Sequence, residues 1–332
     1  MRPFSYQRLQ QPSDIASLQN LSSRDAFIAG GTTLLDLMKL DVMRPARLID
    51  LDALAQTDFG SIEVAHDGLY LGALVRMADA ADHEHVRGHY PVVSQTLDFA
   101  ASQQIRNMAS LGGNVLQRTR CPYFRDTSWS ACNKRDPGSG CAAIGGFNRM
   151  HAVLGTSDNC IATYPGDFAQ ALIALDADVL ITGARGDRTI KFSELHIEPT
   201  DRPDVESRLN PGELIRSFRV PAGPWTRRSA YVKVRDRESY EFAMASAAVA
   251  LHLDGDTVSE ARMALGGVAT VPWRARAAET RLAGKRLDEA AAMDAAEVAF
   301  ADARAYQHNA FKIELGKATL VRALLQVKAM EI

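Results

Sequence analysis

The sequence predicts an α+β protein built from two parts, and three observations support this prediction. Residues 1–222 mix short apolar runs, which are typical of buried strands, with apolar residues at helical spacing. Residues 228–332 place strand patterns first and helical patterns after them. Between the two, "VPAGPWTRRS" at 220–229 has the prolines and the glycine of a connection. A chain of 332 residues is long enough for two domains with a core each.

The first part is expected to contain several strands and helices. "AFIAGG" (26–31) is an apolar run that ends in a glycine turn, and "TLLDLMKLD" (33–41) follows it with helical spacing. Further strands are expected at 48–51, 69–74 and 178–183, and further helices at 90–107 and 167–177. The stretch 196–213, rich in proline and charge, predicts an irregular connection.

The second part predicts a small antiparallel sheet with helices behind it. "SAAVALHL" (246–253) and "TVSEARMALGGV" (257–268) are joined by "DGD" (254–256), which is typical of a hairpin turn. "RSAYVKVRD" (228–236) supplies a third strand. Helices are expected at 273–284, 287–305 and 309–330.

Composition excludes several classes of partner. The net charge of -2 argues against a broad basic surface for nucleic acid or anionic lipid. The N-terminal residues lack the apolar run of a secretory signal. The most apolar window, 243–253, has about half the length that a membrane span needs. We therefore expect no membrane span and no export signal on this chain.

Two glycine-rich turns mark a candidate nucleotide site. The first (29–33) lies between a predicted strand and a predicted helix, where glycine admits a close ligand and free amides attract phosphate oxygens. The second (110–114) follows a predicted helix, and together the two can grip a diphosphate from both sides. A plain strand–helix turn is the alternative for the first loop taken alone. "GSGCAA" (138–143) matches a dinucleotide motif by letter, but no strand precedes it.

The four cysteines, Cys121, Cys132, Cys141 and Cys160, have the spacing C-x10-C-x8-C-x18-C. Zinc knuckles and ferredoxin spacing are both absent. The spacing leaves open a metal or cluster site, two disulfides, or unrelated thiols. Basic residues outnumber acidic ones six to two between 118 and 150, which suits the negative charge of a thiolate-bound [4Fe–4S] cluster but also a solvated surface loop. A loop of this length needs internal fastening.

Five segments carry a resemblance to a known family. They are "FIAGGTTLLDLMK", the run 105–155 around the first three cysteines, "CIATYPGDFAQALIALDA", "PGELI" and "VKVRDRESYEFAMAS". They resemble the FAD-binding medium subunit of molybdenum hydroxylases, the flavoprotein component of the xanthine dehydrogenase and carbon monoxide dehydrogenase family. The cysteine insert is most similar to that of bacterial periplasmic aldehyde oxidoreductase, whose medium subunit carries an extra [4Fe–4S] cluster. The resemblance extends over essentially the whole chain.

The resemblance implies a fold and a domain division. The implied fold is a two-lobed FAD-binding domain of the xanthine dehydrogenase/vanillyl-alcohol oxidase type, followed by a C-terminal domain with a three-stranded antiparallel sheet and a three-helix bundle. The FAD-binding domain spans 1–222, with lobes at 1–55 and 56–222 and a [4Fe–4S] loop at 118–161. The C-terminal domain spans 228–332.

The resemblance also implies site residues. The cluster ligands are Cys121, Cys132, Cys141 and Cys160. The FAD-binding residues are Phe27, Ile28, Ala29, Gly30, Gly31, Thr32, Thr33, Leu34, Ser110, Leu111, Gly112, Gly113, Asn114, Asp167, Leu214, Ile215 and Lys233. Without the family, Asp167 would be interpreted as a helix N-cap and Lys233 as an ordinary strand residue. No catalytic acid or base is implied in this chain.

The function implied by the resemblance is electron transfer within a heterotrimer. A large subunit with a molybdenum cofactor would oxidise an aldehyde, and a small subunit would pass the electrons through [2Fe–2S] clusters to FAD in this chain. FAD then delivers them to an external acceptor such as ferredoxin, a quinone, a dye or oxygen. The complex is expected in the periplasm, exported together on a partner's signal, and otherwise in the cytoplasm.

Three alternatives stay open at this point. The chain can be a non-catalytic assembly subunit whose loop is closed by zinc or disulfides. It can be the FAD subunit of a hydroxylase for N-heterocycles. A self-sufficient flavin oxidase of the vanillyl-alcohol oxidase type is disfavoured, because the short C-terminal domain offers little room for a substrate cavity.

Overall fold

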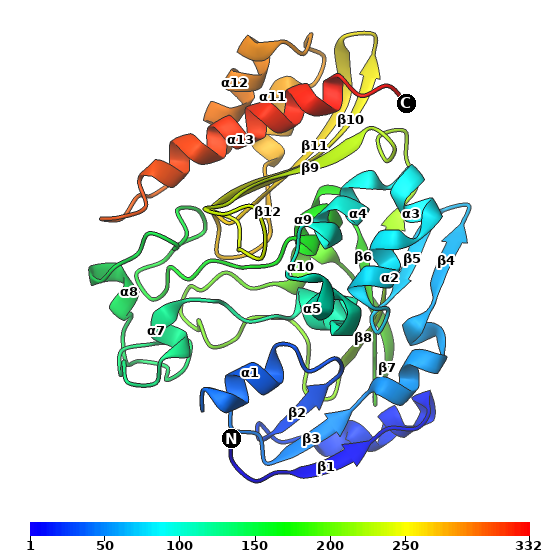
Figure 1. Ribbon diagram of the computed structural model, residues 1–332, viewed down its shortest axis with the longest axis vertical. Coiled ribbons are helices and arrows are strands. Elements are labelled where there is room, and N and C mark those ends of the chain that lie inside the picture. The colour runs from blue at the N-terminus through cyan, green and yellow to red at the C-terminus, as the bar shows by residue number, and fades with distance from the viewer.

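Three separate sheets organise the molecule from one end to the other (Figure 1). The computed structural model describes the backbone of residues 1–332 and every side chain except those of Gln19 and Asn20. The sheet nearest the N-terminus lies at one end, the last helices lie at the opposite end, and a five-stranded sheet lies between them. The predicted mixture of helices and sheets is confirmed. No helix in the described chain is both long and apolar enough to cross a membrane.

The first sheet is parallel, with β3 (Arg47–Asp50) between β1 (Ser5–Arg8) and β2 (Asp25–Ile28). The apolar runs predict β2 and β3, and both are confirmed. No pattern indicates β1, because three of its four residues are exposed and only pairing with β3 makes it a strand. Helix α1 (Leu34–Lys39) follows β2, as predicted, but is shorter than 33–41. The other helices of this lobe are η1 (Pro12–Asn20), η2 (Asp52–Gln56) and η3 (Asp58–Gly60).

The second sheet is antiparallel throughout, in the order β4-β5-β8-β6-β7. Its strands are β4 (Ile62–Ala65), β5 (Gly68–Gly72), β6 (Asp178–Gly183), β7 (Gly186–Lys191) and β8 (Leu214–Pro221). The predictions at 69–74 and 178–183 are confirmed by β5 and β6. The helices around it are α2 (Met77–Asp82), α3 (Glu84–His89), α4 (Pro91–Asp98), α5 (Gln103–Met108), α6 (Leu111–Val115), α9 (Phe168–Ala174) and α10 (Phe192–Leu195).

The helical pattern at 90–107 forms two helices instead of one. Ala101 has a φ of 50°, in the left-handed region that a helix cannot continue through. Ser102 then starts α5 by accepting the amide of Ile105 on its side chain. The apolar spacing alone does not reveal this break, because Ile105 of α5 packs, partly buried, against the same core that buries α4.

The third sheet has the order β12-β11-β10-β9. Its strands are β9 (Ser229–Val234), β10 (Ala245–Asp254), β11 (Thr257–Gly266) and β12 (Trp273–Arg274). The three predicted strands and their hairpin are confirmed, and the two-residue β12 adds a fourth. Because β12 pairs with β11, the first helix starts later than 273. The helices are α11 (Arg276–Leu282), α12 (Glu289–Ala299) and α13 (Phe311–Lys328).

Both faces of this third sheet are buried. Along β10, Ala248 and Ala250 pack into the core of the second lobe, whereas Ala247, Val249 and Leu251 pack into a core with the C-terminal helices. Side chains alternate between the faces of a strand, so one apolar run serves two cores. Figure 1 shows α11, α12 and α13 together on the side of the sheet that faces away from the second lobe.

Candidate functional site

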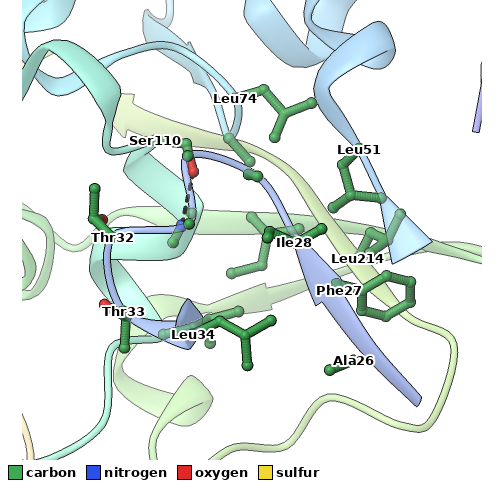
Figure 2. A pocket seen from close by; sticks show the side chains of 18 of the residues that line it. Ala26, Phe27, Ile28, Thr32, Thr33, Leu34, Leu51, Leu74, Ser110 and Leu214 are labelled. Carbon is green, nitrogen blue, oxygen red and sulfur yellow. Dashed lines mark hydrogen bonds between the residues drawn. The ribbon is translucent and has the colours of Figure 1, made fainter. Parts of the chain in front are cut away.

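The two glycine loops meet across a cavity of about 380 Å³. Figure 2 shows Thr32 and Thr33 on the loop that follows β2, Ser110 on the second loop, and Leu51, Leu74 and Leu214 around the same space. The expected FAD residues that line it are Phe27, Ile28, Ala29, Gly30, Gly31, Thr32, Thr33, Leu34, Ser110, Gly112, Gly113, Leu214 and Ile215. Segments that lie far apart in the sequence thus share one cavity.

Glycine is required where the loops touch. A Cβ on Gly30 would lie 1.9 Å from the Met108 carbonyl oxygen, and one on Gly112 would lie 3.0 Å from the Ala73 Cβ. Gly31 has a φ of 72°, which glycine adopts without strain. The first loop therefore lies directly on the backbone that leads into the second.

The amides of the second loop are largely occupied by the protein itself. Leu111 and Gly112 donate to the carbonyls of Val75 and Ala73, at 3.0 and 2.8 Å. Gly113 donates to the Ser110 hydroxyl at 3.2 Å, a bond drawn in Figure 2. A phosphate at this site would therefore depend on the first loop and the hydroxyl of Thr32 or Thr33.

Several residues of the cavity have no signal in the sequence. Leu51, Ala73 and Leu74 line it from the ends of β3 and β5, and Arg118 lines it from the start of the cysteine loop. The others are Asp25, Ala26, Met43, Leu116, Leu209 and Glu213. Most are ordinary apolar residues that only the tertiary fold brings to the ligand.

A second cavity, of about 500 Å³, adjoins the first and shares Thr32 and Thr33 with it. Asn114 and Asp167, two of the expected FAD residues, line this space. The Asn114 Oδ1 atom is buried and has no hydrogen-bond partner among the described residues. A buried acceptor of this kind is normally satisfied, so a ligand in this cavity would complete its bonding.

Asp167 is held in a buried network with the C-terminal domain. Its carboxylate accepts hydrogen bonds from the Tyr231 hydroxyl at 2.5 Å and from Lys233 Nζ at 2.7 Å. Burial, followed by the charge of Asp167, raises the pKa of Tyr231 well above its ordinary value. Asp167 occupies the N-cap of α9, but its side chain does not cap the helix. Asp167 is therefore at the N-cap position, as its sequence context predicts, but its carboxylate binds Tyr231 and Lys233 instead of the helix amides.

Two expected FAD residues do not reach either cavity wall. Leu111 is fully buried in the core of the second lobe. The Lys233 side chain is 2% exposed and donates to Asp167 and to the Phe99 carbonyl. In this structure Lys233 acts on the site through Asp167.

Comparison with known proteins identifies the family. The FAD binding domain in molybdopterin dehydrogenase matches residues 2–223, and the CO dehydrogenase flavoprotein C-terminal domain matches residues 229–327. The chain is an FAD-binding medium subunit of the molybdenum hydroxylase family. It is 45% identical, over 99% of both chains, to the aldehyde oxidoreductase FAD-binding subunit PaoB of Escherichia coli K12. It is 25% identical to the glyceraldehyde dehydrogenase medium chain of Sulfolobus acidocaldarius, over 86% of this chain and 83% of that one.

Solved structures of the family share this fold. A chain of carbon monoxide dehydrogenase from Hydrogenophaga pseudoflava matches with a TM-score of 0.76 at 24% identity, over 99% of this chain and 98% of that one. A chain of quinoline 2-oxidoreductase from Pseudomonas putida 86 matches with a TM-score of 0.75 at 22% identity, over 98% and 97%. At these identities the likeness concerns the fold.

The two adjoining cavities fit the cofactor of this medium subunit. FAD consists of two ring systems joined by a diphosphate, and the structure offers two spaces that meet at Thr32 and Thr33. Glycines allow close backbone approach at the junction, and Asn114, whose side-chain oxygen has no partner among the described residues, lines one space. FAD supplies hydride and single-electron chemistry when bound, and this chain supplies the binding surface.

The four cysteines of the medium subunit line one small cavity. All four are free thiols, and Cys132 and Cys141 face each other in a short β-bridge. The hydrogen bond from Cys160 lowers the pKa of Cys141 to about 6, and burial raises that of Cys121 to about 12. His151 Nε2 lies 3.2 Å from the Cys121 sulfur.

By ligand type, this donor set would suit an iron–sulfur cluster. Among the residues with described side chains, no three His, Cys, Asp or Glu groups come close enough together to hold one metal ion. In a [4Fe–4S] cluster each thiolate binds its own iron, so the four sulfurs stay farther apart than the ligands of zinc. Four thiols line one cavity, which is the ligand type that iron–sulfur clusters take, and the sulfurs of Cys141 and Cys160 are in hydrogen-bond contact.

The basic residues near the cysteines are mostly paired with carboxylates from elsewhere. Arg118 and Lys134 share Glu206, at 2.5 and 2.8 Å. Arg149 pairs with Asp236 at 2.6 Å. Counting charges within the loop therefore overstates its positive charge, because these carboxylates lie outside the counted segment.

Side-chain hydrogen bonds stabilise the cysteine loop (118–161). The Arg135 guanidinium donates to the carbonyls of Tyr123 and Phe124, at 2.8 and 2.9 Å, and to that of Trp129. Only two short helices occur in this segment, α7 (Pro122–Arg125) and α8 (Ala142–Gly145). The loop thus depends on a few long side chains.

Proposed function

We propose that this chain is the FAD- and [4Fe–4S]-carrying electron-transfer subunit of a molybdenum-dependent aldehyde oxidoreductase. The observation that carries the proposal is that three cavities lie close together. Two of them meet at the glycine loops. The third is lined by the four cysteines and is reached past Arg120 and Cys121. The identity of 45% with an aldehyde oxidoreductase subunit over nearly the full length supports the substrate class.

The residues of this chain bind and orient cofactors and perform no acid–base step. The first loop, with Thr32 and Thr33, receives the diphosphate of FAD. Leu214 and Ile215, at the start of β8, provide an apolar wall. Asp167 faces the second cavity and is held there by Tyr231 and Lys233.

Partner chains complete the reaction in this proposal. A large subunit oxidises the aldehyde at a molybdenum cofactor, and a small subunit brings electrons to FAD through [2Fe–2S] clusters. The complex is a heterotrimer that is exported to the periplasm on a partner's signal. Co-expression with the two partners and cell fractionation tests this part: recovery of the assembled complex in the cytoplasm alone would contradict export.

A spectrum of the purified complex tests the cofactor assignment. We expect a flavin band near 450 nm, with a broad iron–sulfur absorption beneath it. Cys132→Ser should remove one class of iron–sulfur signal in electron paramagnetic resonance and leave FAD bound, because Cys132 is one of four cavity ligands and lines neither FAD cavity. A colourless complex would refute the FAD assignment, and unchanged iron–sulfur signals in the variant would refute the cluster.

Turnover of the same variant separates two roles of the cluster. If the cluster relays electrons to an acceptor protein, Cys132→Ser should lose turnover with ferredoxin and keep turnover with a small dye. If both activities persist in the folded, FAD-loaded complex, the cluster only fastens the loop. Zinc, the alternative occupant, would give neither an iron signal nor visible absorption.

A further inference from the structure

The wall of the second cavity contains two arginines that share a single carboxylate. Arg125 lies 2.8 Å and Arg120 3.4 Å from the same oxygen of Asp36. All three side chains line the 500 Å³ cavity and are less than 40% exposed. Two positive charges against one negative leave a net positive charge on this wall.

The other charged groups of this cavity are balanced. Asp167 is neutralised by Lys233 behind it, and Arg237 pairs with Glu241 at 3.3 Å. The excess charge therefore belongs to Arg120 and Arg125. Because the site is partly closed to solvent, this charge is screened less than a surface charge would be.

The same two arginines also have unused donors. The Arg120 Nε and the Arg125 Nη1 atoms are buried and have no hydrogen-bond partner within the described part of the chain. The Arg120 guanidinium additionally lies over the ring of Phe242, 5.1 Å from its centroid, which fixes its plane. These two atoms are closed off from the cavity, so a ligand there would meet the guanidinium charge rather than these donors. A fixed cation of this kind is suited to a ligand that gains negative charge.

We propose that Arg120 and Arg125 stabilise the negative charge that the FAD ring gains on reduction, so that Asp36 and the two arginines set the flavin potential. This inference rests on the proposed function, because it requires FAD in the adjoining cavities with its flavin ring in the second one. Uptake of two electrons from the partner's clusters and one proton from solvent leaves the ring with one negative charge. A nearby cation raises the potential of such a couple.

Arg120 also lies close to the cysteine cavity, so its charge is expected to act there too. It precedes Cys121, which lines the cysteine cavity, and both residues line the small cavity between the two sites. The charge of Arg120 therefore lies beside both redox sites. Its removal is expected to lower the flavin potential and, by a smaller amount, the potential of the cluster.

The test uses the holocomplex and measures the flavin midpoint potential together with sulfite binding. Sulfite bonds through its sulfur lone pair to N5 of the oxidised ring and leaves a negative charge on it, so it reports the same stabilisation without turnover. Arg120→Gln should weaken sulfite binding ~10-fold, which corresponds to about 30 mV for a two-electron couple. Arg120→Lys keeps the charge and should stay within about threefold of the wild type.

Two further variants distinguish an electrostatic effect from a general loss of folded protein. Asp36→Asn removes the shared carboxylate and should shift both readouts in the opposite direction. Arg281→Gln, which removes a positive charge paired with Asp294 and lines neither FAD cavity, is the control and should shift neither by more than about twofold.

The outcomes separate this inference from the proposed function. FAD-loaded complexes in which Arg120→Gln and Asp36→Asn both keep the wild-type potential and sulfite affinity overturn the inference and leave the proposed function intact. A wild-type complex without FAD overturns both.

Discussion

The FAD cavities and the cysteine cavity lie beside each other but are constructed differently. The first cavity is walled by glycine backbone and by apolar residues at the ends of β2, β3, β5 and β8. The cysteine cavity is walled by irregular chain with two four-residue helices. Its shape is held by long cations such as Arg135 and Lys134, which reach carbonyls and a distant carboxylate.

This difference separates two kinds of vulnerability. A site made by backbone packing tolerates most side-chain changes but not the loss of a required glycine or of a buried charge partner. A site made by side-chain hydrogen bonds loses its order when a single cation is removed, while the rest of the fold persists. The following four changes test that separation.

Asp167→Ala should have the largest effect. It leaves Lys233, whose side chain is 2% exposed, without its carboxylate partner. Removing one member of a buried ion pair costs about 3–5 kcal/mol, measurable as a lower free energy of unfolding. Asp294→Ala is the matched control, because its partners Arg281 and Lys285 are surface residues and the cost should be ~0–1 kcal/mol. Equal losses in the two variants would contradict the buried network.

Gly30→Val should weaken FAD binding ~100-fold, because overpacking of this kind costs about 3 kcal/mol. The added Cβ would collide with the Met108 carbonyl and push the two loops apart. FAD titration of the apo complex measures the effect. Gly88→Ala is the control, since nothing lies within 4 Å of the new Cβ. Normal FAD affinity in Gly30→Val would show that the loops need not touch.

Arg135→Ala should disorder the cysteine loop and leave FAD in place. The guanidinium binds three carbonyls of that loop, and hydrogen bonds from a charged group contribute about 2 kcal/mol each. Limited proteolysis between 118 and 161, read beside the FAD content, measures the change. Arg202→Ala is the control, because the Arg202 side chain is exposed and pairs with Asp204 two residues on. Loss of FAD together with loop order would show that the two regions are not separable.

Glu213→Gln should have the smallest effect, and its loss of stability should be present above pH 4.5 and shrink in acid. The hydrogen bond from Arg188 lowers the pKa of Glu213 from 4.5 to about 2. A carboxyl with a lowered pKa stabilises the fold above its unfolded pKa and loses that contribution as the pH falls from 4.5 toward 2. Screening by solvent reduces the contribution to about 1 kcal/mol. Melting temperatures at pH 6 and pH 3 measure it, and an unchanged difference between these pH values in the variant would contradict the assignment.

The sequence alone predicts those site residues whose type is required by local backbone geometry or by their own chemistry. The glycines at 30, 31, 112 and 113 are visible because loops with close contacts need them, and the cysteines are visible because thiols are rare. The strands of the C-terminal sheet are visible because a run buried on both faces is apolar throughout.

The remainder depends on contacts between distant segments. Some basic residues near the cysteines pair with carboxylates that lie outside residues 118–150, so a count of charges in that segment does not include them. These carboxylates belong to Asp36, Glu206 and Asp236. The break at Ala101 and the exposed strand β1 have no periodic signal. Asp167 looks like a helix cap until the partners on β9 are known.

The sheet that is buried on both faces has a consequence for the modularity of the chain. Although two family domains meet at 223–229, Ala248 and Ala250 complete the core of the first domain, and Tyr231 and Lys233 complete its acidic contact at Asp167. An isolated FAD domain would expose an apolar surface and leave a buried carboxylate unpaired. We therefore expect the two domains to unfold in a single calorimetric transition and to tolerate exchange between relatives only as a pair.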